Sequence, residues 1–355
     1  MVQLMWKRPE GVEDVHALVQ TAINLEFSTL PPYLYALMSI PPGENLEARQ
    51  RIYAIAMEEM IHMCLACNIM NAIGGSPDIA APRYPGPLPG DVAQGLIIHL
   101  YPFSPAAAEQ GMHIEQPEDP INASVMKAAM DRAGTEPVTI GEFYERLKVV
   151  LSQLPASAWS ADRNQIDDSQ FFQGNLFKVN TYADAAQAID NIVSEGEGTP
   201  QTPGENGSPL DFQNEMAHYY RFKEIFLNKV LTRTGQPGGG YQWGPQTLGI
   251  DWTKVYPAIT DPEQHDFSNE PAAAREAQAE CDAAYAAMIA GLRGAFNGDP
   301  GQLGVAVRAM FDLRMAARKA FTTPLNDGRV AGPAFVVPGP YWKASNETRT
   351  SGEVA

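Results

Sequence analysis

The sequence predicts a mainly α protein: a four-helix bundle with a long crossover insertion that contains a small β element, and additional C-terminal helices. Three observations predict this architecture. Four segments carry apolar residues at helical spacing, the second and fourth each carry a Glu-x-x-His pair, and residues 76–180 separate the second segment from the third. The four bundle segments are residues 12–38, 44–73, 182–197 and 209–231.

The first segment, residues 12–38, has the periodicity of a long amphipathic helix. Glu26 lies in register with its apolar stripe, so we expect this carboxylate to point inward. Pro31 and Pro32 follow one turn later, and proline removes a backbone donor and clashes with the preceding turn, which predicts a kink or break. The apolar stripe consists of Val15, Val19, Ile23 and Leu30.

The second segment, residues 44–73, places Glu59 and His62 within its apolar stripe and ends at Gly74 and Gly75. Residues three apart on a helix lie on one face, one turn from each other. Two polar residues inside a core stripe need partners, because an unpaired buried carboxylate is costly. The rest of the stripe consists of Ile55, Ala66, Ile69 and Ile73.

The third segment, residues 182–197, buries Ile189 and Val193, and Glu197 continues that row at i+4 and i+8. Glu195 is about two residues out of phase, so Glu197 is the preferred inward group. The Ser-Glu-Gly-Glu-Gly run makes this helix end irregular and leaves Glu195 as the alternative.

The fourth segment, residues 209–231, carries Glu215, His218, Phe222 and Ile225 along one stripe. A third Glu-x-x-His match, at Glu13, faces away from the apolar side of its helix and is not taken as part of a site.

Two Glu-x-x-His helices and one glutamate from each of two further helices would surround a pair of metal ions in a four-helix bundle. Four glutamates contribute −4 and two divalent ions +4, so the assembled core would be neutral. Carboxylate and imidazole ligands favour iron, with manganese or a mixed iron and manganese pair as alternatives. The competing interpretation is six solvated or salt-bridged helix residues. The predicted metal ligands are Glu26, Glu59, His62, Glu197, Glu215 and His218.

The insertion and the C-terminal region carry their own patterns. "LIIHLYPF" (residues 96–103) reads as a strand, and "MHIEQPE" (residues 112–118) is the candidate to pair with it. "TIGEFYERLKVVLSQL" (residues 139–154) reads as a helix with a threonine cap. Two more helices are expected within residues 271–321. We therefore expect one elaborated domain, residues 1–343, and a disordered polar tail, residues 344–355.

Composition limits the partners and the setting. The net charge is −17, from 42 acidic and 25 basic residues, which argues against nucleic acid or an anionic membrane as a partner. No run approaches a membrane span and no signal peptide is evident, so a cytoplasmic location is expected. Cys64, Cys67 and Cys281 fit a reducing compartment and core packing. Glu58 is assigned to solvent or a neighbouring helix, and Tyr33 to core packing.

Long segments of the chain resemble the ferritin-like domain of the iminophenyl-pyruvate dimer synthase family, known from bisindole pigment assembly of the violacein and rebeccamycin type. The segments are "AINLEFSTLPPYLYAL", "AMEEMIHMCLACNIMNAIGGSPDI", "LYPFSPAAAEQGMHIEQPE", "TIGEFYERL", "IVSEGEGT", "AHYYRFKEI" and "AGPAFVVP". The resemblance covers residues 10 to 340 and implies the ferritin-like bundle and its metal ligands. The biosynthetic enzymes are much longer chains, so the dimerising activity is not carried over.

These observations favour a non-haem dimetal oxidoreductase that uses O2 or peroxide on a small organic molecule in bacterial specialised metabolism. Aromatic amino acids or their imino derivatives are implied as substrates by the resemblance alone. We expect the substrate pocket near Pro31 and Pro32 and in residues 235–266. The alternatives are an iron-handling ferroxidase or catalase-like protein, and a non-catalytic scaffold. The sequence identifies no catalytic residue beyond the ligands and leaves a homo-oligomer open.

Overall fold

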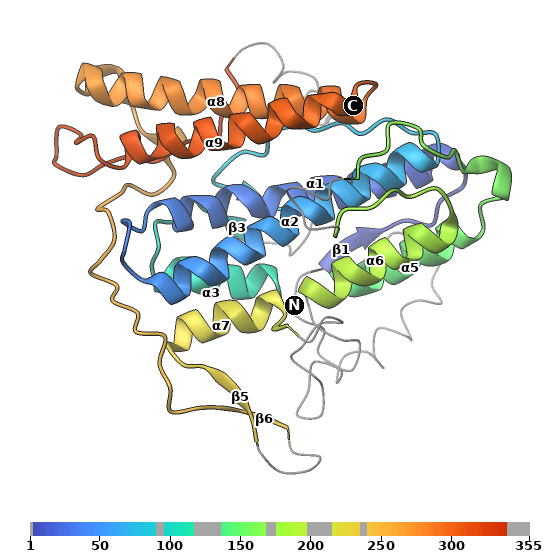
Figure 1. Cartoon of the computed structure of the whole chain (residues 1–355), viewed down its shortest axis with the longest axis horizontal. Coiled ribbons are helices and arrows are strands. Elements are labelled where there is room, and N and C mark those ends of the chain that lie inside the picture. The colour runs from blue at the N-terminus through green and yellow to red at the C-terminus, as the bar shows by residue number, and fades with distance from the viewer. Residues whose placement is uncertain are drawn as a thin grey trace, which may run out of the picture.

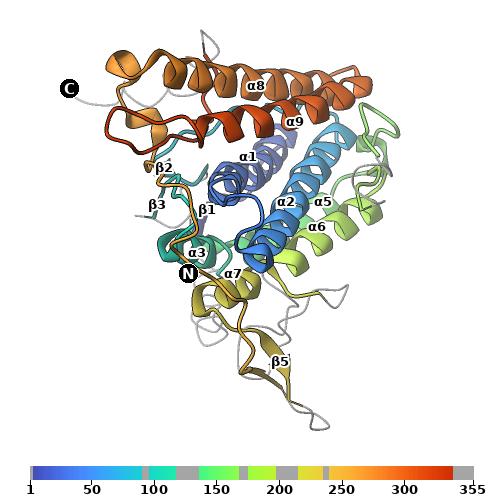
Figure 2. The same ribbon diagram turned by 60° about the vertical axis from the view of Figure 1, so that its left-hand side comes forward.

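The computed structural model describes residues 3–89, 96–116, 136–167, 175–196, 215–234 and 240–338, and its helices form three layers (Figures 1 and 2). The middle layer is α1 (Val12–Met38) with α2 (Leu46–Ala72). A hairpin of α8 (Ala272–Phe296) and α9 (Leu303–Ala320) covers one side of it. The other side is covered by α3 (Pro105–Ile114), α5 (Ile140–Ser152), α6 (Tyr182–Gly196) and α7 (His218–Leu227). The predicted mainly helical fold is confirmed.

Helix α1 continues through Pro31 and Pro32, so the expected break is wrong, while the alternative expectation of a kink stays a prediction. In a helix, the N–H of residue 32 would bond to the carbonyl of Ser28, and proline leaves that carbonyl unpaired. The Tyr84 hydroxyl donates to the Ser28 carbonyl at 2.5 Å and takes the place of the missing N–H. A tyrosine from the insertion therefore stabilises the proline-containing turn next to Glu26.

Helix α2 is long and apolar enough to cross a membrane, but 72% of its most apolar stretch is buried inside the protein. It packs against α1, α6, α7 and α8, and its C-terminal half is buried without interruption from Ile61 to Ala72. Cys64 and Cys67 are buried within this stretch and form no disulfide with a described residue, as core packing predicts. This half of the helix is apolar nearly all round because it has no solvent face, unlike the N-terminal half, where Tyr53 is exposed.

The strands are short and lie at the edges of the helical layers. The expected strand in "LIIHLYPF" is reduced to β3 (Ile97–Ile98), and its partner is β2 (Gly86–Pro87), so the predicted pairing with "MHIEQPE" is wrong. Residues 112–114 instead end α3, which begins where Ser104 caps the N–H of Ala107 at 3.2 Å and Pro105 occupies the first helical turn. The antiparallel pairs are β1 (Gln3–Trp6) with β4 (Glu136–Thr139), β2 (Gly86–Pro87) with β3 (Ile97–Ile98), and β5 (Leu231–Arg233) with β6 (Tyr241–Trp243).

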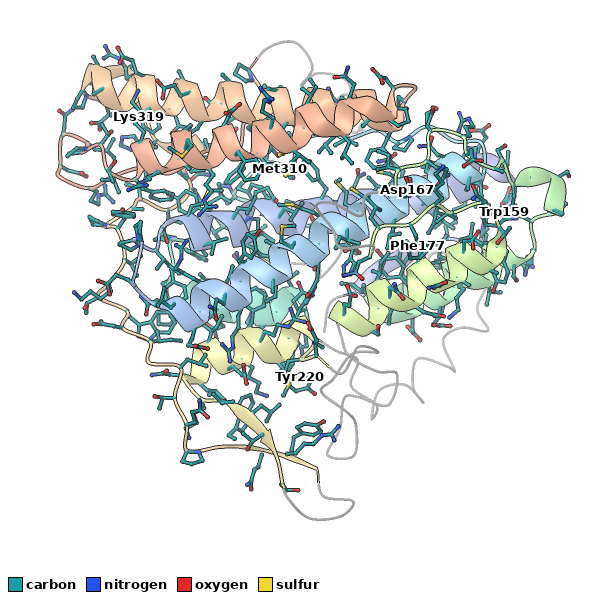
Figure 3. All side chains as sticks on the ribbon, in the orientation of Figure 1. Trp159, Asp167, Phe177, Tyr220, Met310 and Lys319 are labelled. Carbon is teal, nitrogen blue, oxygen red and sulfur yellow. The ribbon has the colours of Figure 1, made fainter. Side chains whose placement is uncertain are left out.

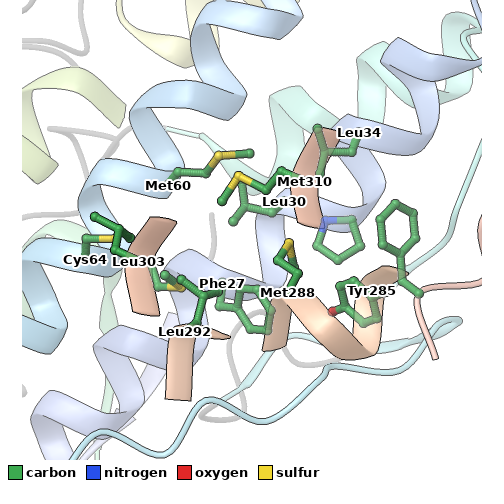
Figure 4. Close-up of a pocket in the computed structure, with 13 residues that line it drawn as sticks. Phe27, Leu30, Leu34, Met60, Cys64, Tyr285, Met288, Leu292, Leu303 and Met310 are labelled. Atoms are coloured by element: carbon green, nitrogen blue, oxygen red, sulfur yellow. The ribbon is translucent and has the colours of Figure 1, made fainter. Parts of the chain in front are cut away.

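The α8–α9 hairpin is closely packed at one crossing and leaves a cavity beneath it. A Cβ on Gly291 would lie 2.8 Å from the backbone nitrogen of Ala306, so only glycine allows this approach. The cavity between the hairpin and the α1–α2 layer is lined by apolar and sulfur-containing side chains (Figure 4). Among them are Phe27, Leu30, Met60, Met63, Met288 and Met310.

Tyr84→Phe should destabilise the protein by about 1–3 kcal/mol, because the buried Ser28 carbonyl would lose its donor. Urea unfolding of the whole chain measures this cost. Tyr53→Phe is the control, since Tyr53 is 54% exposed and should change stability by less than about 0.5 kcal/mol. In a Pro32→Ala background the residue-32 N–H can reach the same carbonyl, so the cost of Tyr84→Phe should shrink. An equal cost in both backgrounds would contradict this account of the helix.

Candidate metal centre

A cluster of buried carboxylates and imidazoles lies between the middle layer and the layer of α3, α6 and α7. Its members come from the middle of α1, from α2, from the C-terminus of α3 and from the first residue of α7. Their ligand atoms form two groups, each compact enough to hold one metal ion, and both groups include Glu59. One group is Glu26, Glu59 and His62, and the other is Glu59, Glu115 and His218.

The two histidines are held in equivalent ways. His62 directs Nδ1 toward Glu26 Oε2 at 3.4 Å and Glu59 Oε1 at 3.9 Å, while its Nε2 lies 2.5 Å from Glu195 Oε2. The two ring centroids, of His62 and His218, are 5.7 Å apart. Each ring thus offers one nitrogen to the cluster and contacts an outer carboxylate with the other, which fixes the ring orientation.

On the second histidine, Nδ1 of His218 lies 2.8 Å from Glu59 Oε1 and 3.5 Å from Glu115 Oε2. Its Nε2 lies 2.8 Å from Glu58 Oε2, and Arg221 donates to both oxygens of Glu58 at 2.9 and 2.7 Å. Hydrogen bonding to His218 and the charge of Arg221 outweigh burial and lower the pKa of Glu58 to about 2. Glu58 thus contacts a neighbouring helix, as the sequence favoured.

Each inner carboxylate is oriented by one hydroxyl group. Tyr144 donates to Glu26 Oε1, Thr29 donates to Glu59 Oε2 at 2.9 Å, and the Tyr33 hydroxyl donates to Glu115 Oε1 at 2.5 Å. The carboxylate oxygen that does not accept from a hydroxyl faces a histidine Nδ1. This oxygen is Oε2 in Glu26 and Glu115 and Oε1 in Glu59. The hydroxyls therefore fix which oxygen points into the cluster, an arrangement that suits ligation.

The electrostatics of the cluster call for a positive charge at its centre. Burial, followed by the charge of Glu115, raises the pKa of Glu59 from 4.5 to about 8. Burial alone would lower the pKa of His62 and of His218, but the surrounding carboxylates raise both well above 6.5. Protons therefore occupy the cluster when no metal does.

The donor atoms fit a pair of divalent cations. Nδ1 of His218 is buried and, despite its short distance to Glu59, has no partner in hydrogen-bonding geometry among the described residues. A lone pair in that position suits a metal ion bound between the imidazole and the carboxylates. Glu58 is neutralised by Arg221, and the four remaining negative charges would balance two divalent ions. Those four are Glu26, Glu59, Glu115 and Glu195.

The structure brings together four of the six predicted ligands: Glu26, Glu59, His62 and His218. It does not bring in Glu215, whose side chain is 62% exposed and lies 3.5 Å from Arg221. The expectation that Glu215 and His218 share a helix face is wrong, because α7 begins only at His218 and residues 215–217 precede the helix. Whether any of these residues ligates a metal stays a prediction.

Glu115 is the residue that the sequence interpretation missed. It caps the C-terminus of α3 and is 8% exposed. Its signal was present, because it lies seven residues after the buried Ala108 and four after the buried Gly111, a helical spacing. The signal was lost when residues 112–118 were interpreted as a strand.

Glu197 lies outside the described residues, whereas Glu195 is 5% exposed and contacts His62. The inward row of α6 passes through Ala188, Ile192 and Glu195, and Val193 is only partly buried. The expectation that Glu195 is out of phase with the inward row is therefore wrong. Its position on the Nε2 side of His62 makes it an outer partner of that ring.

A family model described as ferritin-like matches residues 19–227, more than half of the chain and all of the elements that carry the cluster. The chain belongs to the ferritin-like family. A crystal structure of a ferritin-like protein from Caulobacter vibrioides matches with a TM-score of 0.61 and 24% identity, covering 91% of this chain and 98% of that one. This similarity shows the same fold. No curated protein matches the chain. The narrower iminophenyl-pyruvate dimer synthase assignment stays a prediction.

Glu115→Gln should lower metal occupancy sharply, because a neutral amide replaces an anionic donor next to His218. Glu215→Gln should leave occupancy close to that of the parent protein, since this side chain is directed to solvent and Arg221. Elemental analysis after anaerobic iron reconstitution compares the two variants. Loss of metal with Glu215→Gln and not with Glu115→Gln would restore the original ligand assignment.

The metal-free protein should lose stability as the pH rises. The folded-state pKa of Glu59 exceeds its ordinary value, so folding takes up a proton, and stability falls between about pH 4.5 and about pH 8. The raised pKa values of His62 and His218 act in the same direction above about pH 6.5. The lowered pKa of Glu26 acts in the opposite direction, at lower pH.

Thermal melts of chelator-treated protein from about pH 5.5 to about pH 8.5 measure this dependence. Glu59→Gln should flatten the slope, and divalent metal should raise the melting temperature most at the upper end. A melting temperature that rises over this range in the metal-free protein would contradict the predicted protonation of the cluster.

Proposed function

We propose that this protein is a dimetal oxidoreductase, with iron favoured over manganese, that uses O2 or peroxide on a small organic molecule in the cytoplasm. The observation that carries the proposal is the pair of three-residue groups that share Glu59, with every donor side chain buried. Carboxylate oxygens with imidazole nitrogens suit iron and manganese better than metals that prefer thiolate ligands.

When bound, two such ions would supply electrons to O2 or peroxide. The chain would contribute the arrangement around them. Glu59 belongs to both groups and would help to hold the pair of ions, and its Oε1 faces Nδ1 of both histidines. Thr29 holds the other oxygen of Glu59 and so limits its rotation. Arg221 and Glu58 fix His218 from the outside, which keeps Nδ1 directed at the cluster.

A second cavity adjoins the Glu115 side of the cluster; it is only large enough for a water molecule in this structure and would have to widen to admit an organic substrate. Its walls come from α1, α2, α3 and α7, and Tyr33, which donates to Glu115, is one of them. Phe222 packs on Tyr33 with ring centroids 4.8 Å apart. The apolar and aromatic walls favour a planar, apolar molecule, consistent with an aromatic amino-acid derivative. Pro32 lines this cavity, near one of the two expected positions, whereas no described residue of the other, 235–266, lines it.

The resemblance to the iminophenyl-pyruvate dimer synthase family supports an imino acid as the substrate class. The α8–α9 hairpin and the insertion support an enzyme over an iron-storage protein, because they enclose the bundle in structure that storage does not need. The hydroxyl donors on all three inner carboxylates also favour a precisely held centre over a scaffold that has lost its metal.

The test is anaerobic reconstitution with iron(II), followed by exposure to O2. We expect about two iron ions per chain, an absorbance change on oxidation, and O2 consumption that increases with an aromatic amino or imino acid in a substrate panel. Phe222→Ala should change the KM for that substrate and leave iron content unchanged, since Phe222 lines the cavity but offers no ligand atom.

Three outcomes would contradict the proposal. Binding of hundreds of iron ions in a hollow shell would indicate storage. Rapid O2 release from peroxide without any organic substrate would indicate a catalase-like protein. Failure to bind iron or manganese after careful reconstitution would indicate a scaffold.

A further inference from the structure

The outward face of the α8–α9 hairpin has an unusual composition. Phe311 and Met315, one turn apart on α9, are 56% and 64% exposed. At the same levels along the antiparallel hairpin, α8 exposes small side chains at Ala283 and Ala287. Single exposed apolar residues are common, but two large ones on one helix face beside a row of alanines form a patch of the kind that proteins cover.

The register of the hairpin can be read from two contacts. Lys319 Nζ lies 2.6 Å from Glu280 Oε1 near one end, and Gly291 meets Ala306 near the other. Figure 3 shows Lys319 and Met310 at separate positions along α9. Between these two anchors the antiparallel helices place Phe311 level with Ala287 and Met315 level with Ala283. By the same register Arg318 is level with Glu280.

We propose that this hairpin face, defined by Glu280, Ala283, Ala287, Phe311, Met315 and Arg318, binds the same face of a second copy of the chain. A two-fold axis parallel to the hairpin and within the interface places α9 of each copy on α8 of the other. Rotation about such an axis does not change height along the helices. Phe311 and Met315 therefore meet Ala287 and Ala283 of the second copy, large side chains against small ones, and Arg318 meets Glu280.

The distribution of charge favours a second copy of the chain as the binding partner of this face. The chain has a net charge of −17, yet the exposed charged residues of α9 are mostly basic. The N-terminal half of α8 exposes Glu276 and Glu280. In the two-fold arrangement, the basic end of α9 in each copy faces this acidic part of α8 in the other copy. The other two-fold orientation pairs α8 with α8 and α9 with α9, which brings the mostly basic exposed charges of the two α9 helices together.

The size of the face sets the expected affinity. The 18-residue α9 is about 27 Å long, and two helices side by side are about 20 Å wide, so each copy contributes on the order of 500–600 Å². That area is at the lower end for a stable protein–protein interface. The dimer should therefore dissociate at low micromolar concentration and form at higher concentration.

Sedimentation velocity of the full chain from about 1 to about 200 μM should show a concentration-dependent monomer–dimer equilibrium. Phe311→Glu should weaken the dimer at least about tenfold, since it buries a charge against alanine. Ala287→Arg should do the same from the opposite helix. Val149→Glu is the matched control, because Val149 is equally exposed, at 56%, but lies on α5, away from the hairpin face. Circular dichroism and iron content should be unchanged in all three variants, which separates this test from that of the proposed function.

A charge exchange tests the orientation. Arg318→Glu and Glu280→Arg should each weaken the dimer, and the double variant should recover it, because the two positions meet across the interface. A monomer throughout the concentration range would overturn the proposal. So would a dimer that Phe311→Glu and Ala287→Arg leave intact, or a monomer that instead binds anionic vesicles through the basic face of α9.

Discussion

Glu59 is the constraint on which the centre of this protein depends. Its carboxylate is almost fully buried, lies near a nitrogen of both histidines, and belongs to both candidate ligand groups. A buried charge of this kind is tolerated only with a counter-charge, whether a proton or a metal ion. The hydroxyl bonds to the inner carboxylates and the outer pairs of His62 and His218 are arranged around that requirement. The stability of the fold and the charge state of the cluster are therefore coupled through one residue.

The middle layer holds this centre because its two helices are packed on both sides. Helices α1 and α2 face the polar cluster on one side and the apolar cavity under α8 and α9 on the other. Their C-terminal halves are consequently buried on nearly every face. The same packing lets α1 tolerate two prolines, since Tyr84 supplies the donor that Pro32 lacks. Packing on both sides thus keeps Glu26 and Glu59 at a fixed separation, although one side of the two helices is polar and the other is apolar.

Local periodicity predicted the long helices well. The stripes of α1 and α2 placed Glu26, Glu59 and His62 inward, and the structure brings all three together. Periodicity was less reliable at element ends, where the helical phase no longer applies. Glu215 precedes α7 by three residues, so its spacing from His218 carries no information about a shared face. Glu195, next to the last residue of α6, was assigned to the wrong face because Val193 was taken as part of the buried row.

By itself, the sequence determined the fold class, the long helices and four of the inner residues. An amphipathic stripe can be read from the local sequence, and the helix then buries that stripe against the core. Only the tertiary structure decided that Glu115 completes the second group and that Tyr33, Thr29 and Tyr144 hold the inner carboxylates. Tyr33 meets Glu115 across 82 positions of the chain, and Tyr144 meets Glu26 across 118. No local spacing encodes such contacts; they follow from how the helical layers pack.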